Sequence, residues 1–283
     1  MNILITGCNG QLGNEMQLLE KNYPQHTWFN TDVEELDISN QLAVEQFVAE
    51  NQIDGIVNCA AYTAVDKAEE QKELCTTLNT VAPSYLAAAI EKRQGWMIQI
   101  STDYVFNGTK YTPYVETDTP CPDSVYGSTK LAGELGVSKF CRRAMIIRTA
   151  WLYSTFGNNF VKTMLRLGKE KTELGVIFDQ IGTPTYARDL AQIIMTAIDK
   201  GVQPGVYHFS NEGVTSWFDF TKTIHRLAGI ESCRVRPIHT TDYPTPATRP
   251  HYSVLDKSKI TPNSSFSRPK RSIVFTKLLP NVL

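Results

Sequence analysis

The sequence has no long apolar run and almost no net charge. None of its apolar stretches reaches the ~18 residues that a membrane-spanning helix needs, so we expect no membrane partner. The formal net charge of −1 excludes the strong positive field typical of nucleic-acid-binding proteins. A short basic cluster at residues 268–271 is interpreted as part of a solvated tail. The 42% of apolar residues indicates an ordinary globular protein with a buried core.

The six cysteines show neither a C-x-x-C pair nor a Cys/His run with zinc spacing. Several lie in apolar stretches, as reduced and buried cysteines do. The first predicted strand begins directly after Met1 and leaves no room for a signal peptide. These features favour a reducing, cytoplasmic location. There is also no internal repeat and no low-complexity segment.

A glycine-rich turn lies at the start of the chain. Residues 2–5 form a short apolar run, and Thr6-Gly7-Cys8-Asn9-Gly10-Gln11-Leu12-Gly13 follows at once, before a stretch with apolar residues at helical spacing. This strand, turn and helix are typical of a pyrophosphate site. The glycines let the backbone approach the phosphates, and the helix N-terminus presents free N–H groups. The alternative is that the glycines only close an ordinary turn.

Asp32 follows the second predicted strand, residues 27–31, and lies nineteen residues after Gly13. A carboxylate at about that spacing typically binds the adenosine ribose of a dinucleotide and repels a 2′-phosphate. Glu34 and Glu35 add negative charge, and no lysine or arginine flanks Asp32. We therefore predict that NADH is the preferred cofactor and that NADPH is also possible. The alternative is that Asp32 only caps the turn that follows it.

The rest of the chain alternates between apolar runs and amphipathic stretches, as expected for right-handed βαβ units. This pattern predicts an α/β fold with a doubly wound, Rossmann-like parallel sheet and a smaller C-terminal substrate-binding lobe. We expect residues 1–150 to form mainly the dinucleotide-binding domain and residues 151–283 mainly the lobe, with segments interleaved. Strands are predicted at residues 55–61, 96–101, 144–148 and 205–209. Helices are predicted at residues 39–50 with Ser39 as cap, 125–140, 158–169, 187–199 and 217–227, and one or two helices within residues 69–93.

Tyr126 and Lys130 form a Tyr-x-x-x-Lys pattern on the predicted helix 125–140. Residues four apart share one helix face, so the phenol and the ammonium point into the same space. We expect the ammonium to lower the pKa of the phenol toward neutrality, which suits a general acid for a developing alkoxide. Thr102, at the end of a predicted strand, offers a hydroxyl to the same oxygen. The pattern alone occurs by chance on solvated helices, but Thr102 and the glycine turn together favour a hydride-transfer site.

The glycine turn and the Tyr-x-x-x-Lys pattern resemble the extended short-chain dehydrogenase/reductase superfamily, whose members act on nucleotide sugars. Further stretches are similar to its dTDP-4-dehydrorhamnose reductase family, and they span nearly the whole chain: residues 10–13, 36–38, 58–69, 101–106, 126–134, 148–151, 157–161, 179–185 and 245–250. The resemblance implies that NAD(P)H reduces the C4 keto group of dTDP-4-dehydro-L-rhamnose to give dTDP-L-rhamnose. This reaction belongs to dTDP-rhamnose and cell-surface polysaccharide biosynthesis.

The resemblance also implies residue roles. Tyr126 would donate the proton, and Lys130 would also hold the nicotinamide ribose. Thr102 and Asp103 would bind the sugar, and Trp151 would pack on it, unless Trp151 is simply a core aromatic. The cofactor would be bound, besides Tyr126 and Lys130, by Gly7, Gly10, Gln11, Leu12, Gly13, Asp37, Ile38, Ala61, Tyr62 and Thr63.

A divalent metal bridges subunits in some members of this family. Glu15 matches one of the metal-binding positions, but Arg188 stands where a second acid is needed. We therefore expect no metal site, and both a monomer and a homodimer remain open.

Two other functions remain open. An epimerase or dehydratase of the same fold is the first, although a dehydratase commonly has Asp-Glu after the hydroxyl residue and here Tyr104 follows Asp103. A non-catalytic, cofactor-binding regulatory subunit is the second, and the intact Thr102, Tyr126 and Lys130 argue against it. We also predict that the proline-rich loop at residues 240–250 closes over the nucleotide sugar. Arg249 would then bind the diphosphate, with a surface salt bridge as the alternative.

Overall fold

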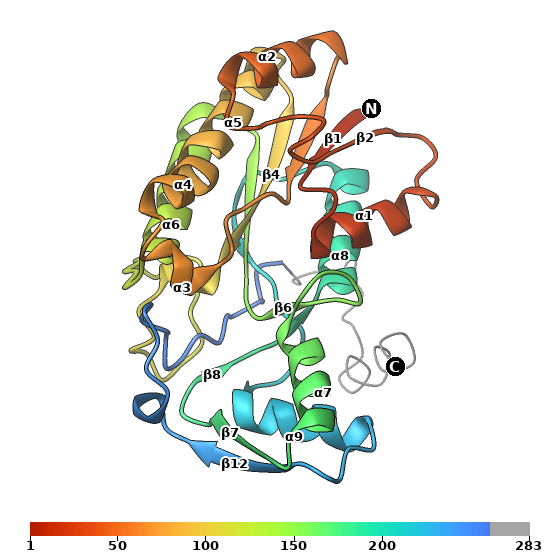
Figure 1. Cartoon of the computed structure of the whole chain (residues 1–283). Coiled ribbons are helices and arrows are strands. Elements are labelled where there is room, and N and C mark those ends of the chain that lie inside the picture. The colour runs from red at the N-terminus through yellow and green to blue at the C-terminus, as the bar shows by residue number, and fades with distance from the viewer. Residues whose placement is uncertain (261–283) are drawn as a thin grey trace.

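The structure is a computed structural model, and it describes residues 1–260. Its centre is a six-stranded sheet in which neighbouring strands run parallel, in the order β10-β5-β4-β3-β1-β2 (Figure 1). The predicted doubly wound parallel sheet is confirmed. Its strands are β1 (Asn2–Thr6), β2 (Thr27–Thr31), β3 (Gly55–Asn58), β4 (Trp96–Thr102), β5 (Ala144–Thr149) and β10 (Gly205–His208).

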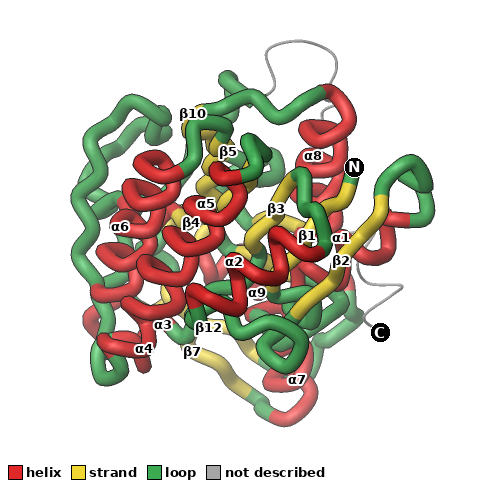
Figure 2. Tube along the Cα trace, turned by 90° about the horizontal axis from the view of Figure 1, so that it is seen from above, coloured by secondary structure: helices red, strands yellow, loops and turns green. Residues whose placement is uncertain are grey.

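Helices cover both faces of this sheet. Figure 2 shows α2 (Gln41–Glu50), α5 (Ala82–Lys92) and α6 (Val125–Phe140) along one face, while α1 (Gln11–Glu20) and α8 (Ala187–Lys200) pack together on the other. Strand β1 shows why both faces must be apolar. Ile3 and Ile5 pack into the core beneath α1 and α8, whereas Leu4 packs into the core beneath α2 and α5. Successive side chains of a strand point to opposite faces, so a doubly covered strand is apolar throughout.

The order of the strands creates a switch point beside β1. The chain runs from β1 outward to β2 and then returns to β3 on the other side of β1. The connections that leave the carboxyl ends of β1 and β3 therefore diverge. In open parallel sheets, ligands bind in the crevice at such a point.

Three predicted elements differ from the structure. Strand β3 ends at Asn58, not at residue 61, and the cap of α2 is Asn40, whose side chain accepts from Ala43 N, not Ser39. Residues 69–93, predicted to hold one or two helices, contain α4 (Lys72–Thr76), a π-helical turn η1 (Thr77–Val81) and α5, and a short helix that was not predicted, α3 (Val65–Ala68), precedes them.

Asn79 gives the reason for the π-helical turn. Its buried side chain accepts from Tyr62 N at 2.9 Å and donates to Tyr62 O at 3.1 Å. The wider turn lets an amide on a helix replace the ladder partners that the chain loses after β3 ends.

The sheet takes its sixth strand from beyond residue 150. Strand β10 pairs with β5, and α8 packs against α1. Residues 187–208 thus belong to the same layer as the glycine turn. The boundary near residue 150 stays a prediction.

The remaining elements form a lobe at the carboxyl ends of the strands, in the lower part of Figure 1. Its core contains Tyr153, Val161, Leu165, Phe220 and Ile224. Its elements are β6 (Leu152–Tyr153), α7 (Phe160–Glu170), β7 (Glu173–Ile177), β8 (Ile181–Gly182), β9 (Thr185–Tyr186), β11 (Thr215–Ser216), α9 (Trp217–Leu227) and β12 (Arg234–Ile238), with the 3₁₀ turns η2 (Asp103–Val105) and η3 (Thr240–Asp242) nearby in the loops. Within residues 1–260, no helix has the length and apolar character needed to cross a membrane. The basic cluster at residues 268–271 lies outside the described residues.

Candidate active site

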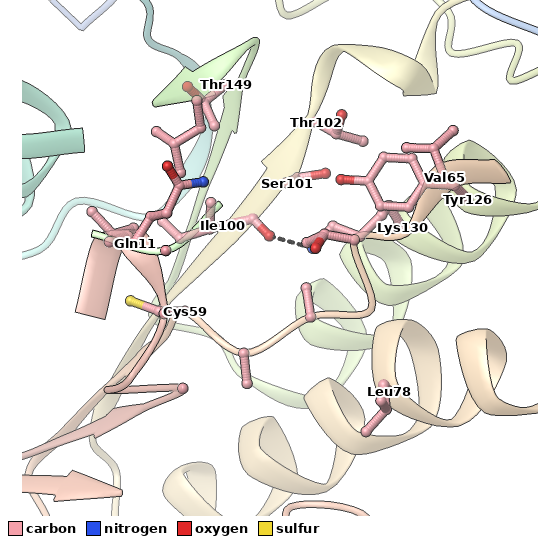
Figure 3. A pocket seen from close by; sticks show the side chains of 18 of the residues that line it. Gln11, Cys59, Val65, Leu78, Ile100, Ser101, Thr102, Tyr126, Lys130 and Thr149 are labelled. Atoms are coloured by element: carbon pink, nitrogen blue, oxygen red, sulfur yellow. Dashed lines mark hydrogen bonds between the residues drawn. The ribbon is translucent and has the colours of Figure 1, made fainter. Parts of the chain in front are cut away.

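A cavity of about 910 Å³ lies between the carboxyl ends of the strands and the lobe. Figure 3 shows that Thr102, Tyr126 and Lys130 gather on one side of it, whereas Gln11 and Thr149 lie across from them. Most of the sequence-predicted residues line this cavity: Gly7, Gly10, Gln11, Leu12, Asp32, Asp37, Ile38, Ala61, Thr63, Thr102, Asp103, Tyr126, Lys130 and Trp151.

The glycine turn fits a dinucleotide pyrophosphate. Gly7 has a φ of +66°, and a Cβ there would lie 2.7 Å from the backbone of Ala60. Gly13 does not line the cavity, because its Cα packs against the backbone of Gly7 and Cys8, where a Cβ would clash. No side chain caps the first turn of α1 at Gly10. The helix N-terminus is therefore close to the turn and open to an anion.

Asp32 lines the cavity and also contacts the glycine turn. Its Oδ2 accepts from Asn9 N at 3.1 Å, and its Oδ1 accepts from Val33 N at 2.9 Å. Asp32 therefore lies at the cavity, as the predicted ribose site requires, and also accepts hydrogen bonds from the neighbouring backbone, as the alternative of a turn cap requires. Asp37, further along the same wall, has a lowered pKa because the Ser39 hydroxyl and N–H both donate to it.

The three catalytic candidates come from two elements. Thr102 is the last residue of β4, and its hydroxyl accepts from Tyr104 N at 3.2 Å. Tyr126 and Lys130 lie one turn apart on α6, which Ser124 caps. Lys130 Nζ donates to the carbonyl of Ile100 at 2.6 Å. The strand and the helix therefore bring a hydroxyl, a phenol and an amine to one wall of the cavity.

Burial controls both pKa values in this group. Burial raises the pKa of Tyr126 to about 12, against a hydrogen bond with Thr102 that lowers it, and the charge of Asp103 raises it further. Burial lowers the pKa of Lys130 to about 8. The expectation that Lys130 lowers the phenol pKa toward neutrality is wrong, because removing water disfavours phenolate and ammonium alike.

Comparison with known proteins agrees with this geometry. The family model described as "RmlD substrate binding domain" matches residues 1–278. The dTDP-4-dehydrorhamnose reductase of Escherichia coli K12 is 40% identical over 99% of this chain and 97% of its own length. The chain belongs to the dTDP-4-dehydrorhamnose reductase family.

Two solved structures of this family are similar over the full fold. The dTDP-4-dehydrorhamnose reductase of Clostridium acetobutylicum superimposes with a TM-score of 0.89 at 47% identity, covering 93% of each chain. The enzyme of Bacillus anthracis, solved in complex with NADP, has a TM-score of 0.89 at 41% identity, covering 93% of this chain and 92% of its own.

In this member of the reductase family, Trp151 and Trp217 form a stacked aromatic pair, called the aromatic shelf below, and Trp151 lines the cavity. Its ring stacks on Trp217 of α9, with centroids 3.4 Å apart and planes 7° from parallel. Its backbone has a φ of 49°, which is strained for a residue with a Cβ. Trp151 is partly exposed in the cavity and so differs from a fully buried core aromatic.

Asp103 is a buried carboxyl beside Thr102. Thr102 Oγ1 lies 3.1 Å from Asp103 Oδ1, and burial raises the pKa of Asp103 to about 6, against hydrogen bonds with Ser253 and Thr102 that lower it. Such a group is suited to bind a sugar hydroxyl in the cavity.

Arg249 and Tyr62 do not line the cavity. Arg249 forms a two-pronged ion pair with Asp66 of α3, through Nη1 to Oδ1 at 2.9 Å and Nη2 to Oδ2 at 2.7 Å, and it also donates to Thr245 Oγ1. The salt bridge weighed as the alternative for Arg249 is therefore present, and it ties the loop at residues 240–250 to α3. The backbone of Tyr62 is instead held by Asn79.

Several residues of the cavity wall have no role in the sequence analysis. Tyr104 packs edge-to-face on Tyr126 at 5.4 Å, and Cys59 has a pKa that burial raises to about 12. Gly157 and Asn158 enter the cavity from the loop before α7, where Asn159 donates to Gln11 Oε1 at 3.1 Å. Only the family resemblance at residues 157–161 marks this loop in the sequence.

Glu15 and Arg188 form an ion pair with each other. Glu15 is fully buried on α1, and its second oxygen accepts from the Ser154 hydroxyl at 2.7 Å. Arg188 thus places a cation against Glu15, the acid that the family resemblance marks as a metal-binding position in some members. Within residues 1–260, no cluster of three or more metal-ligating side chains occurs.

Proposed function

We propose that this protein reduces the C4 keto group of dTDP-4-dehydro-L-rhamnose to dTDP-L-rhamnose with hydride from NAD(P)H. One observation carries the proposal most directly. Thr102, Tyr126 and Lys130 lie on one wall of the cavity that begins at the glycine turn. Family membership supports the substrate, since the full-length relatives are named dTDP-4-dehydrorhamnose reductase.

Each residue then has a defined task. Bound NAD(P)H supplies the hydride to C4 of the sugar. Tyr126, whose high pKa keeps it protonated, gives its proton to the C4 oxygen, and the Thr102 hydroxyl holds the same oxygen. Lys130 in its ammonium form stabilises the phenolate that remains and holds the nicotinamide ribose. Asp103 and Trp151 hold the sugar.

Loss of NAD(P)H absorbance with a dTDP-4-keto-6-deoxy sugar tests the reaction. A reductase consumes one cofactor for each sugar reduced. An epimerase or a dehydratase returns the cofactor to its starting state, and a regulatory subunit binds it without turnover. Either of these results overturns the proposal. Tyr104 in the position after Asp103 favours simple reduction, because burial raises the pKa of this phenol well above its usual range and it is no base at neutral pH.

For the cofactor, we propose a preference for NADH within a site that accepts both forms. Asp32 brings a carboxylate to the wall of the cavity. Glu35 is a second acid, which accepts a hydrogen bond from Asp32 N at 2.8 Å, so neither residue supplies a cation for a 2′-phosphate. The Bacillus anthracis relative was solved with NADP, which supports use of the phosphorylated form too.

The ratio of kcat/KM for NADH to that for NADPH tests this preference. Asp32→Asn keeps an acceptor for Asn9 N but removes the charge, so the ratio should fall by about tenfold or more, the effect of ~1.4 kcal/mol of repulsion. A parent ratio at or below one overturns the preference. An unchanged ratio in Asp32→Asn shows that another group sets it.

The place of this reaction in dTDP-rhamnose biosynthesis and a cytoplasmic location follow from the same proposal. Sedimentation of the purified protein separates a monomer from a homodimer.

A further inference from the structure

Glu134 is a buried carboxylate directly behind the catalytic wall. It follows Lys130 by four residues on α6, so Tyr126, Lys130 and Glu134 form one stripe along the helix. The residue is 3% exposed. Its oxygens accept from the Ser101 hydroxyl, from Arg148 Nε at 2.9 Å and from Arg148 Nη2 at 2.7 Å.

These contacts join strand β4 to helix α6 just before Thr102. Ser101 reaches Glu134, and the preceding carbonyl, that of Ile100, accepts from Lys130. Two consecutive residues of β4 are thus tied to the helix that carries Tyr126. The relative position of the Thr102 hydroxyl and the Tyr126 phenol depends on this junction.

Arg148 of β5 balances the charge of Glu134. It is 3% exposed, and its Nη1 lies 3.5 Å from His208 Nε2. Burial and the charge of Arg148 lower the pKa of His208 to about 4, so this histidine is neutral at neutral pH. The ion pair therefore has its negative end toward Lys130 and its positive end toward a neutral ring.

We propose that Glu134 is a positioning residue for the reduction: it locks Ser101, and with it Thr102, against the helix of Tyr126, and it presents a negative charge to Lys130. This inference rests on the proposed function of Thr102, Tyr126 and Lys130.

The negative charge that Glu134 presents to Lys130 should affect how kcat depends on pH. The groups whose charges act on the Lys130 ammonium are Glu134 on α6, Cys75 on α4 and Cys59 after β3. Tyr126, one turn away on α6, is influenced by Asp103 of η2 and by Cys75. Among these, Glu134 raises the Lys130 pKa most, against burial, which lowers it to about 8. Removing the negative charge should let the ammonium lose its proton at lower pH.

Three variants separate the two tasks. Ser101→Ala removes only the junction, so kcat should fall about fivefold to tenfold, the effect of one buried hydrogen bond, while the alkaline limb of the kcat profile stays in place. Glu134→Asp keeps the charge but shortens the side chain, so it should behave like Ser101→Ala. Glu134→Gln removes the charge, so kcat should fall and the alkaline limb should move to lower pH by about half a unit or more. In all three, KM for the cofactor should stay within about twofold.

Two further variants make the outcomes distinct. Glu91→Gln removes an exposed Glu–Arg pair, with Arg142, and should leave kcat and its pH profile unchanged. Tyr126→Phe reports on the proposed function itself: if it is fully active, that function fails.

If Tyr126→Phe is inactive but Ser101→Ala and Glu134→Asp keep parental kcat, the positioning role is overturned. An alkaline limb that does not move in folded Glu134→Gln overturns the electrostatic role. If Glu134→Gln does not fold, the kcat values of Ser101→Ala and Glu134→Asp still test the positioning role. Similar falls in kcat for both variants support it, and parental kcat in both overturns it.

Discussion

Replacing Lys130 with methionine should abolish efficient turnover and make the ligand-free protein more stable. Lys130 is 4% exposed, and burial lowers its pKa from 10.5 to about 8. In the unfolded chain the amine is in water and has its ordinary pKa. At pH 7 the folded protein therefore carries a buried ammonium that the unfolded chain holds at no cost.

The size of the effect follows from this shift. Each pKa unit corresponds to about 1.4 kcal/mol, so the buried ammonium destabilises the folded state by about 3 kcal/mol at pH 7. Methionine has a similar shape but loses the hydrogen bond from Nζ to Ile100 O, which contributes about 1 kcal/mol. We expect Lys130→Met to raise the free energy of unfolding by about 2 kcal/mol at pH 7.

The pH dependence checks the cause. Between pH 8 and pH 10.5 the unfolded chain binds more protons at Lys130 than the folded protein does, so parental stability rises with pH in that window. The advantage of the variant should shrink by about 1 kcal/mol per pH unit between pH 8 and pH 10. Urea unfolding of both ligand-free proteins, followed by tryptophan fluorescence at several pH values, measures it. Lys92→Met, at an exposed lysine, is the control. A stability difference that stays constant from pH 7 to pH 10 would refute the reasoning.

Three further predictions concern catalysis and substrate binding. Tyr126→Phe should lower turnover by about 10²–10⁴-fold with the dissociation constant of the cofactor nearly unchanged, because only the proton donor is lost; steady-state rates and cofactor titration measure this, and turnover within about threefold of the parent contradicts it. Arg249→Ala should raise KM for the nucleotide sugar while sparing KM for the cofactor; if Asp66→Asn has the same effect, Arg249 acts by fastening the loop and not by binding the diphosphate. Trp217→Ala should raise KM for the sugar by about fivefold to tenfold, since the shelf under Trp151 loses one aromatic contact of ~1 kcal/mol, and an unchanged KM shows that the shelf does not support the sugar.

Local patterns in the sequence predict much of this fold. Helix α6 begins and ends at the predicted residues, and the Ser124 side chain caps its first turn. Strands β1 and β2 and the glycine turn between β1 and α1 agree as well. Each of these depends on neighbours within a few residues, and such neighbours are visible in the sequence.

The breaks in the predicted elements come from distant partners. The π-helical turn contains Asn79, whose amide pairs with the backbone of Tyr62, and no local signal marks that pairing. Strand β10 joins the sheet only because β5 offers an unpaired edge more than fifty residues earlier.

The sequence by itself determined which chemistry could occur, because the spacing of Tyr126 and Lys130 on a helix places a phenol and an amine on one face. Only the tertiary structure decided their pKa values, since these depend on how far the folded chain removes water from both groups. It also decided the partners of Arg249 and Glu134. Charged side chains pair with whatever the fold brings near, and Asp66 lies 183 residues from Arg249 in the sequence.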